Sequence, residues 1–425
     1  MVIERRGRNL LASSLCAVVV SACASATGGA DVATAPTAIA APPDASEPIA
    51  IPFVEADFAA NEALERALVG SSFRYFRYVN GPFTRAVCAR FASDVQSMPT
   101  VNLHGDAHVE QYAAAVDGRG LADFDAATLG PPIVDWMRFA ASLWLAAGDD
   151  DAGARAAVEA FVKGYRASLA DPDAKGPEPR VVTRLRAAWG TPAEWLDGVE
   201  KLMAPLDDAK KKHMELARAN YMAAMRSQNP DLAESFFAMK RGGRLTVGIG
   251  SAHEEKMLMR VEGPTLAADD DVILETKQFV ATESDCTRGD PDDVRRVIIG
   301  QARIGSPQRL LGTVRFDDRT YYVHAWRMHY DEVDVRDIRD ASELAELAYD
   351  VGLQLGRGHP NGLDTDGKLR ARLGEVLDRE APKMADDARA LADRTKKGWA
   401  AFRKAACATH PVEGCSAGAS ERARQ

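Results

Sequence analysis

The chain has few cysteines, few aromatic residues and no excess of positive charge. Six cysteines occur in 425 residues, aromatic residues make up 7% of the chain, and the formal net charge is −9. No Cys-x-x-Cys pair occurs, so a structural zinc site of that kind is not expected. The acidic balance argues against general affinity for nucleic acid, because such affinity depends on Lys and Arg contacts to phosphate.

Long hydrophobic runs are also missing, except near the N-terminus. Arg5, Arg6 and Arg8 precede an apolar stretch from Leu10 to Val20, which is too short to cross a bilayer and is typical of a secretory signal. Val-Ser-Ala then leads into Cys23, the order of a bacterial lipoprotein cleavage box. We expect a signal peptide over residues 1–22 and lipidation of Cys23; the alternatives are an ordinary signal peptide or a frayed N-terminus.

Residues 23–50 are rich in Ala, Pro, Thr and Ser and carry few charges, which predicts a flexible tether without a core of its own. The expected location is therefore the periplasmic side of a membrane, with the folded part held by acyl chains. In a Gram-negative cell, Ala24 after the lipidated cysteine favours the outer membrane. The membrane is thus one expected partner, and nucleic acid is not.

An exported chain can form disulfides. Cys407 and Cys415 lie eight residues apart with Pro411 and Gly414 between them, a spacing that suits a small closed loop, although the sequence leaves open whether the bridge forms. Cys88 and Cys286 have no such spacing, and we expect them to be buried thiols.

The remaining chain is longer than one compact core usually covers, so two lobes are expected. Hydrophobic periodicity predicts helices at 61–68, 73–79, 136–169, 192–239, 295–303, 341–355 and 368–407. Alternating patterns predict strands within 245–263, 271–280 and 309–327. The expected fold class is α+β: a helical lobe over 51–240, a small antiparallel β lobe over 241–335, and C-terminal helices over 336–425.

The stretch from Val101 to Arg138 carries most of the polar chemistry. An apolar run leads into His104-Gly105-Asp106, a second apolar step leads into Asp123-Phe124-Asp125, and Asp135 heads an apolar helix. Carboxylates at the ends of short apolar strands are costly unless they are paired, hydrogen-bonded or bound to a metal. Phosphoryl transfer uses such groups, because one Asp orients or deprotonates the acceptor hydroxyl while other oxygen ligands hold Mg²⁺.

The predicted β lobe supplies two further elements. Gly248 and Gly250, followed by Ser251, form a glycine-containing turn whose backbone N–H groups could approach phosphates. Lys277 alternates with apolar neighbours in a predicted strand. A lysine there either extends to solvent or pairs with phosphate and an acidic partner.

These motifs, in this order, resemble the bacterial family called domain of unknown function 2252. The resemblance covers about Phe73 to His359 and includes Gly105 to His108, Asp123 to Asp125, Gly130-Pro131, Asp135, Val247 to Ser251 and Lys277. Tyr78 stands where the family usually has glycine.

The central stretch is also similar to the aminoglycoside-phosphotransferase and choline-kinase branch of the protein-kinase-like fold. That resemblance implies that Asp106 is the catalytic Asp of the His104-Gly105-Asp106 motif, and that Asp135 supports the loop. It implies metal ligands at Gln111, Asp123 and Asp125, with Gln111 in place of the usual Asn. Gly248, Gly250, Ser251 and Lys277 would bind the phosphates. Because the β lobe follows the catalytic loop, the fold would be circularly permuted.

Three functions are compatible with these residues. The first is a Mg²⁺-dependent, nucleotide-using phosphotransferase that acts on a small molecule or an envelope component. The second is a binding protein that keeps a kinase-like cleft without catalysis, an alternative favoured by Gln111 and by export. The third is a metallohydrolase that uses His104, Asp106, His108 and Asp123, because alternate residues of an extended segment face one way.

Overall fold

The computed structural model describes residues 46–58, 61–245, 254–281, 286–290, 292–305, 310–316, 319–409, 412, 414 and 415. All of them lie in the second of two compact units, Pro42–Gln425, and the first unit is Met1–Ala41. The expected signal peptide, Cys23 and most of the tether lie outside the described residues. None of the described helices has the length and hydropathy needed to cross a membrane.

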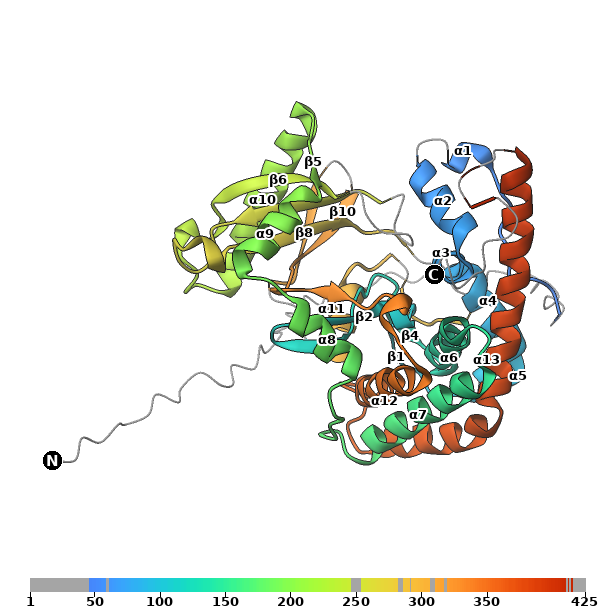
Figure 1. Cartoon of the computed structure of the whole chain (residues 1–425). Helices are drawn as coiled ribbons and strands as arrows, with labels where there is room; N and C mark the ends of the chain where they lie inside the picture. Colours follow the sequence, from blue (N-terminus) through green and yellow to red (C-terminus); the bar gives the residue numbers. More distant parts are fainter. Residues whose placement is uncertain are drawn as a thin grey trace, which may run out of the picture. The chain divides into compact units, whose positions relative to one another are not determined.

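Helices account for most of the described chain (Figure 1). They are α1 Glu55–Phe58, α2 Glu62–Gly70, α3 Ser72–Tyr78, α4 Asn80–Arg90, α5 Ala92–Val95, α6 Ile133–Ala147, α7 Asp151–Ala170, α8 Arg180–Ala188, α9 Pro192–Lys201, α10 Asp208–Gln228, α11 Arg295–Arg303, α12 Ala341–Gly358 and α13 Lys368–Thr409. Short 3₁₀ turns occur at Val109–Gln111, Glu234–Phe237, Ala268–Asp270 and Val335–Asp337.

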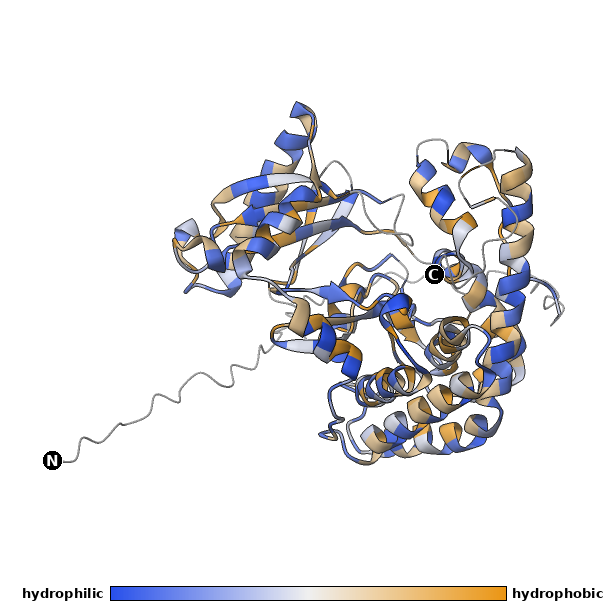
Figure 2. Cartoon of the chain, in the orientation of Figure 1, coloured by the Kyte–Doolittle hydropathy of each residue, from blue (hydrophilic) through white to orange (hydrophobic). Residues whose placement is uncertain are grey.

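The largest hydrophobic core lies among α6, α7, α12 and α13. Helix α6 is buried along nearly its whole length, and Figure 2 shows hydrophobic colours along it, whereas α13 alternates between hydrophobic and hydrophilic residues. Helices α7 and α12 approach closely because glycines face the partner backbone. A Cβ on Gly164 would lie 2.1 Å from the carbonyl oxygen of Tyr349. Larger side chains there would push the two helices apart.

The described strands form three antiparallel sheets. The largest sheet has the order β5-β6-β7-β8-β10-β9, a second sheet pairs β1 with β4, and a third has the order β11-β2-β3. The strands are β1 Val101–Leu103, β2 Tyr112–Ala115, β3 Gly118–Leu121, β4 Thr128–Gly130, β5 Met203–Ala204, β6 Met239–Leu245, β7 Lys256–Val261, β8 Val272–Gln278, β9 Gly312–Phe316, β10 Arg319–Ala325 and β11 Asp331–Glu332.

The two faces of the six-stranded sheet differ in what covers them. Met257, Leu274 and Val323 on one face pack against α10 in a separate hydrophobic core. On the opposite face, Leu258 and Ile273 pack with residues of α9 in a smaller core. Side chains alternate along a strand, so Lys277 of β8 shares this second face with Ile273. The sheet therefore presents polar groups beside a small apolar patch.

The predicted α+β class is confirmed, with mixed helices and small antiparallel sheets. Helix α11 has the predicted bounds, and the predicted helix over 136–169 is divided into α6 and α7 around Gly148. The predicted helical stretch over 192–239 contains the short strand β5 and ends in β6, so the sheet begins before residue 241. Strands of two residues, such as β5 and β11, carry no periodicity that a sequence pattern could detect.

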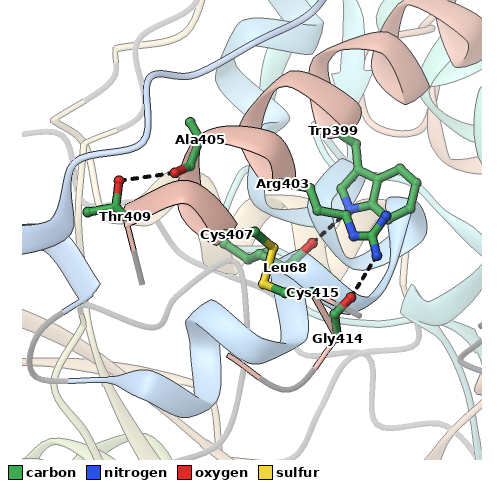
Figure 3. Close-up of a disulfide and its surroundings, with 8 residues drawn as sticks. All are labelled: Leu68, Trp399, Arg403, Ala405, Cys407, Thr409, Gly414 and Cys415. Carbon is green, nitrogen blue, oxygen red and sulfur yellow. Dashed lines mark hydrogen bonds between the residues drawn. A yellow bond between two sulfur atoms is a disulfide. The ribbon is translucent and has the colours of Figure 1, made fainter. Parts of the chain in front are cut away.

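Two disulfides link the described cysteines. Cys407 and Cys415, eight positions apart, form the small closed loop that the spacing suggested, and Figure 3 shows it beside the last turns of α13. Next to it, Trp399 Nε1 donates to the carbonyl of Leu68 at 2.9 Å and Arg403 donates to the carbonyl of Gly414 at 2.7 Å (Figure 3).

The expectation of buried thiols at Cys88 and Cys286 is wrong, because these two residues form the second disulfide. Their Cα atoms lie 5.7 Å apart although 198 positions separate them in the chain. Only the fold brings them together, so no spacing rule could have paired them. The bridge ties α4 to the segment between β8 and α11.

Candidate functional site

The loop that carries Asp106 follows directly after β1. Gly105 has φ +80, and a Cβ at this position would lie 2.0 Å from the carbonyl oxygen of Ala126. Both the backbone conformation and the missing space require glycine. The carbonyl oxygen of Gly105 also accepts a hydrogen bond from Asn80 Nδ2 at 3.0 Å. The loop is therefore held close to the β3–β4 connection, where Asp123 and Asp125 lie.

Asp135, in the first turn of α6, fixes the backbone of this loop. Its carboxylate accepts hydrogen bonds from the backbone N–H groups of His104 at 2.7 Å and Gly105 at 2.8 Å. The side chain is fully buried. His359 Nε2 lies 3.1 Å from the same carboxylate, and Tyr165 bonds the other ring nitrogen of His359 at 2.7 Å. Asp135 thus occupies the loop-supporting position that the resemblance implies.

His104 is also buried and both of its ring nitrogens are engaged. Nε2 lies 2.9 Å from the carbonyl oxygen of Ala122, and Nδ1 accepts a 3.3 Å hydrogen bond from the backbone of Asp106. The imidazole therefore joins the loop to the end of β3. With both nitrogens occupied, His104 is not arranged as a metal ligand, and the geometry gives no support to the metallohydrolase alternative.

Asp106 pairs with a buried arginine from α6. Arg138 Nε donates to Asp106 Oδ1 at 2.9 Å, and another guanidinium nitrogen lies 2.8 Å from the same oxygen. Burial raises the pKa of Asp106 above its ordinary value, and the charge and hydrogen bond of Arg138 offset part of that rise. On the other side of the carboxylate, His108 Nε2 lies 3.8 Å from Oδ2.

Lys277 meets the aspartates of the β3–β4 loop. Its Nζ lies 3.2 Å from Asp123 Oδ1, contacts the carboxylate of Asp125, and lies 3.8 Å from Glu254 Oε2. The lysine side chain is only 5% exposed, so these contacts are its main charge compensation. Asp125 also accepts a hydrogen bond from the hydroxyl of Tyr322, which lies opposite Lys277 in the sheet register.

The carboxyl groups around Lys277 influence one another strongly. Burial acts to raise the pKa of Asp123, but the charge of Lys277 and hydrogen bonds from Asp125 and Lys277 outweigh it and lower that pKa. Burial and the neighbouring charges of Asp123 and Glu254 raise the pKa of Asp125. Burial, followed by repulsion from Asp123, raises the pKa of Glu254 to about 8. Burial and mutual repulsion thus favour the protonated forms of Asp125 and Glu254, whereas Lys277 favours the ionised form of Asp123.

One cavity of about 960 Å³ joins the two groups of residues. Its lining includes five predicted site residues: Asp106, Gln111, Asp123, Asp125 and Lys277. The structure therefore brings the predicted carboxylates, amide and lysine to a common space, while His104 and Asp135 lie behind it. Gly248, Gly250 and Ser251 lie outside the described residues, as does Cys23.

Among the described residues, no three His, Cys, Asp or Glu side chains are arranged to hold a metal ion. The donor types nevertheless fit Mg²⁺, which proteins usually bind through one or two carboxylates together with phosphates of a substrate. Nine carboxyl groups line the cavity, together with two lysines and two arginines. This excess of acidic oxygen atoms favours a cation.

Several residues of the site were not predicted. Arg138 was missed, although a charged residue inside the apolar run of α6 must find a partner when it is buried. Glu254 was missed because no pattern marked it. Arg77 forms a 2.8 Å ion pair with Glu110 on the cavity wall, a contact that no motif indicated. No sequence motif identified the acidic partners of Lys277, which are the carboxyl groups of Asp123, Asp125 and Glu254.

The comparisons with known proteins identify one family. The sequence model described as "Uncharacterized protein conserved in bacteria", domain of unknown function 2252, matches residues 65–192 and 192–405. No curated protein and no solved structure matches the chain.

Proposed function

The chain belongs to the family of domain of unknown function 2252, and on that premise we propose that it is a phosphotransferase that uses Mg²⁺ and a nucleoside triphosphate. The observation that carries this proposal is the meeting of Asp106, Asp123 and Lys277 in one cavity, with Lys277 Nζ 3.2 Å from Asp123 Oδ1. A kinase-like arrangement with permuted chain order remains part of the proposal.

Each residue has a role in this scheme. Asp106 would take the proton of an acceptor hydroxyl, since it lines the cavity and the backbone of its loop is fixed through Asp135. Lys277 would bind donor phosphates, which would compete with the aspartates for its ammonium group. Asp123, Asp125 and Gln111 would hold Mg²⁺, which neutralises phosphate charge when bound.

The acceptor would be a hydroxyl of a small molecule or an envelope component, reached through a cavity of about 960 Å³. We further propose an exported location, with lipid attached to Cys23. Both described disulfides support export, because disulfides persist in oxidising compartments and are rare in the cytosol.

Thermal unfolding with ATP or GTP, each with and without Mg²⁺, tests the proposal. A ligand at 100 times its Kd should stabilise the protein by about 2.7 kcal/mol. Lys277→Met should reduce this shift. Arg184→Met is a suitable control, because Arg184 pairs with Glu343 and does not line the cavity. Absence of a shift with every nucleotide tested would contradict nucleotide use.

Asp106→Asn separates catalysis from binding. The amide keeps the shape and can still accept a hydrogen bond from Arg138, so we expect the nucleotide-induced shift to persist. Phosphate transfer should fall below detection, because an amide cannot act as a base. If both wild type and variant bind Mg²⁺-nucleotide without turnover, the non-catalytic binding protein becomes the better description.

A further inference from the structure

Helix α6 contacts the Asp106 loop through two residues one turn apart. Asp135 holds the backbone N–H groups of His104 and Gly105, and Arg138 holds the side chain of Asp106. Residues three apart lie on the same face of a helix. One helix face therefore sets both the path of the loop and the direction of its carboxylate.

Arg138 is placed in an environment where a cation is costly. Its side chain is 1% exposed, and its guanidinium carbon lies 3.6 Å from the ring centroid of Phe76 and 5.0 Å from that of Phe83. It also donates to the carbonyl oxygen of Phe76 at 2.9 Å. A buried ion pair is weak support for stability, because its desolvation can exceed the attraction between the charges. A role in orienting Asp106 gives this costly arrangement a function.

The two oxygens of Asp106 have different surroundings. Both guanidinium contacts reach Oδ1. Oδ2 has no hydrogen-bond donor within reach in the described part of the chain, and its neighbour His108 Nε2 is 3.8 Å away. The ring nitrogens of His108 have no hydrogen-bond partner among those residues either. One oxygen is thus clamped while the other keeps its lone pairs available.

We propose that Arg138 is the positioning residue of the transfer reaction, which clamps Oδ1 of Asp106 and leaves Oδ2 to take the proton of the acceptor hydroxyl. This inference rests on the proposed phosphotransferase function. The hydroxyl proton moves to Oδ2, and the electron pair of the O–H bond forms the new O–P bond. The P–O bond to the nucleoside diphosphate breaks, and its electrons stay with the diphosphate.

Arg138 also acts on Asp106 through its charge. The other titratable groups whose charges act on this pair come from α3, from the Asp106 loop and from the β3–β4 loop: Arg77, His104, His108 and Asp123. Because Arg138 lowers the pKa of Asp106 against the effect of burial, its removal should raise that pKa further. The acidic limb of the pH–rate profile should then move to higher pH.

The test compares full-length wild type with Arg138→Met, Arg138→Lys and Arg184→Met. Phosphate release from Mg²⁺-ATP and Mg²⁺-GTP, with water as the acceptor, is measured across pH. We expect Arg138→Met to lower kcat about 10²-fold, because a small displacement of a reacting group has an effect of that size. KM for the nucleotide should change little, since Arg138 lines no part of the cavity.

Arg138→Lys, which keeps a cation but loses the two-nitrogen clamp, should lose less activity and show a smaller pH shift. Arg184 makes a comparable arginine–carboxylate pair with Glu343, so Arg184→Met should leave both kcat and the pH limb unchanged. If Arg138→Met does not fold, Arg138→Lys carries the test alone.

An acidic limb of the pH–rate profile that does not move in the Arg138 variants, or a change in KM alone, would overturn the inference. Lack of turnover by wild type itself would instead overturn the proposed function, and this inference with it.

Discussion

At the scale of single residues, the balance of charge around Lys277 governs the behaviour of the site. The carboxyl groups of Asp123, Asp125 and Glu254 all lie within 4 Å of the Lys277 ammonium group. The buried Oε2 of Glu254 has no hydrogen-bond partner among the described residues, and burial together with the charge of Asp123 opposes ionisation of this carboxyl group. Its protonation should therefore report on the electrostatics of the cavity.

Glu254→Gln should become more stable relative to wild type as the pH rises. In the unfolded chain this carboxyl ionises near its ordinary value of 4.5, whereas in the folded protein burial and Asp123 raise its pKa to about 8. Unfolding therefore releases a proton between these values, and wild-type stability falls as pH increases through this window. Urea unfolding at pH 5 and pH 8, with chelator present, measures the difference.

Glu255→Gln is a neighbouring control that keeps the sheet wall of the cavity unchanged, because Glu255 does not line the cavity and instead bonds Tyr321 at 2.8 Å. A pH-independent difference between Glu254→Gln and wild type would show that Glu254 ionises normally.

The sequence allowed some residues of the site to be predicted, but not others. Asp106, Asp123 and Lys277 belong to recognisable motifs, and the described geometry brings them to one cavity. Arg138 escaped prediction because its partner lies 32 positions earlier and only the packing of α6 brings them together. Glu254 escaped prediction because the alternating pattern within 245–263 indicates no partner for its carboxyl group, and only the fold places it near Lys277. Motifs thus identify which groups take part, while charge compensation depends on tertiary packing.

At the scale of secondary-structure elements, long periodic segments were predictable and short ones were not. Helices α11 and α12 follow clear apolar spacing, and their positions agree with the predicted ones. Strands β5 and β11 have two residues each and exist because a neighbouring strand offers backbone partners. Their formation depends on register rather than on side-chain periodicity.

The Cys88–Cys286 disulfide should stabilise the protein more than the Cys407–Cys415 disulfide. The first spans 198 positions and the second spans eight, and a longer closed loop removes more entropy from the unfolded chain. The chain-entropy relation gives a difference of about 3 kcal/mol. Thermal or urea unfolding of Cys88→Ser/Cys286→Ser and of Cys407→Ser/Cys415→Ser, without reductant, measures it. Equal losses would contradict this entropic account.

The same bridge also lies next to the cavity. Thr84, one turn before Cys88 on α4, and Thr287, directly after Cys286, both line it. The disulfide therefore joins two parts of the cavity wall that are far apart in sequence. The loop at Cys407–Cys415 has no lining residue among those described, so it serves as an internal control for effects on ligand binding.

At the scale of the whole molecule, the fold class and the order of helices and strands could be predicted from composition and hydrophobic periodicity. The set of residues that meets around the cavity could not. Residues from 74 to 334 contribute to its wall, including helices, loops and the six-stranded sheet. Such convergence depends on tertiary contacts that a single sequence does not reveal. The resemblance to a family supplied the order of the motifs but no activity.

The proposed attachment to a membrane would depend on a single residue, Cys23. If Cys23 is lipidated, Cys23→Ala should move the protein from the membrane fraction to the soluble fraction, because alanine has no thiol to carry the acyl chains. A single acyl chain binds membranes only marginally, so stable attachment needs the several chains of a lipoprotein anchor. Cell fractionation with mass spectrometry of the mature N-terminus measures the change.

Cys16→Ala, within the apolar part of the expected signal, is the matched control and should remain attached. Retention of Cys23→Ala in the membrane fraction, after a salt wash that removes peripheral proteins, would exclude lipid attachment at this cysteine.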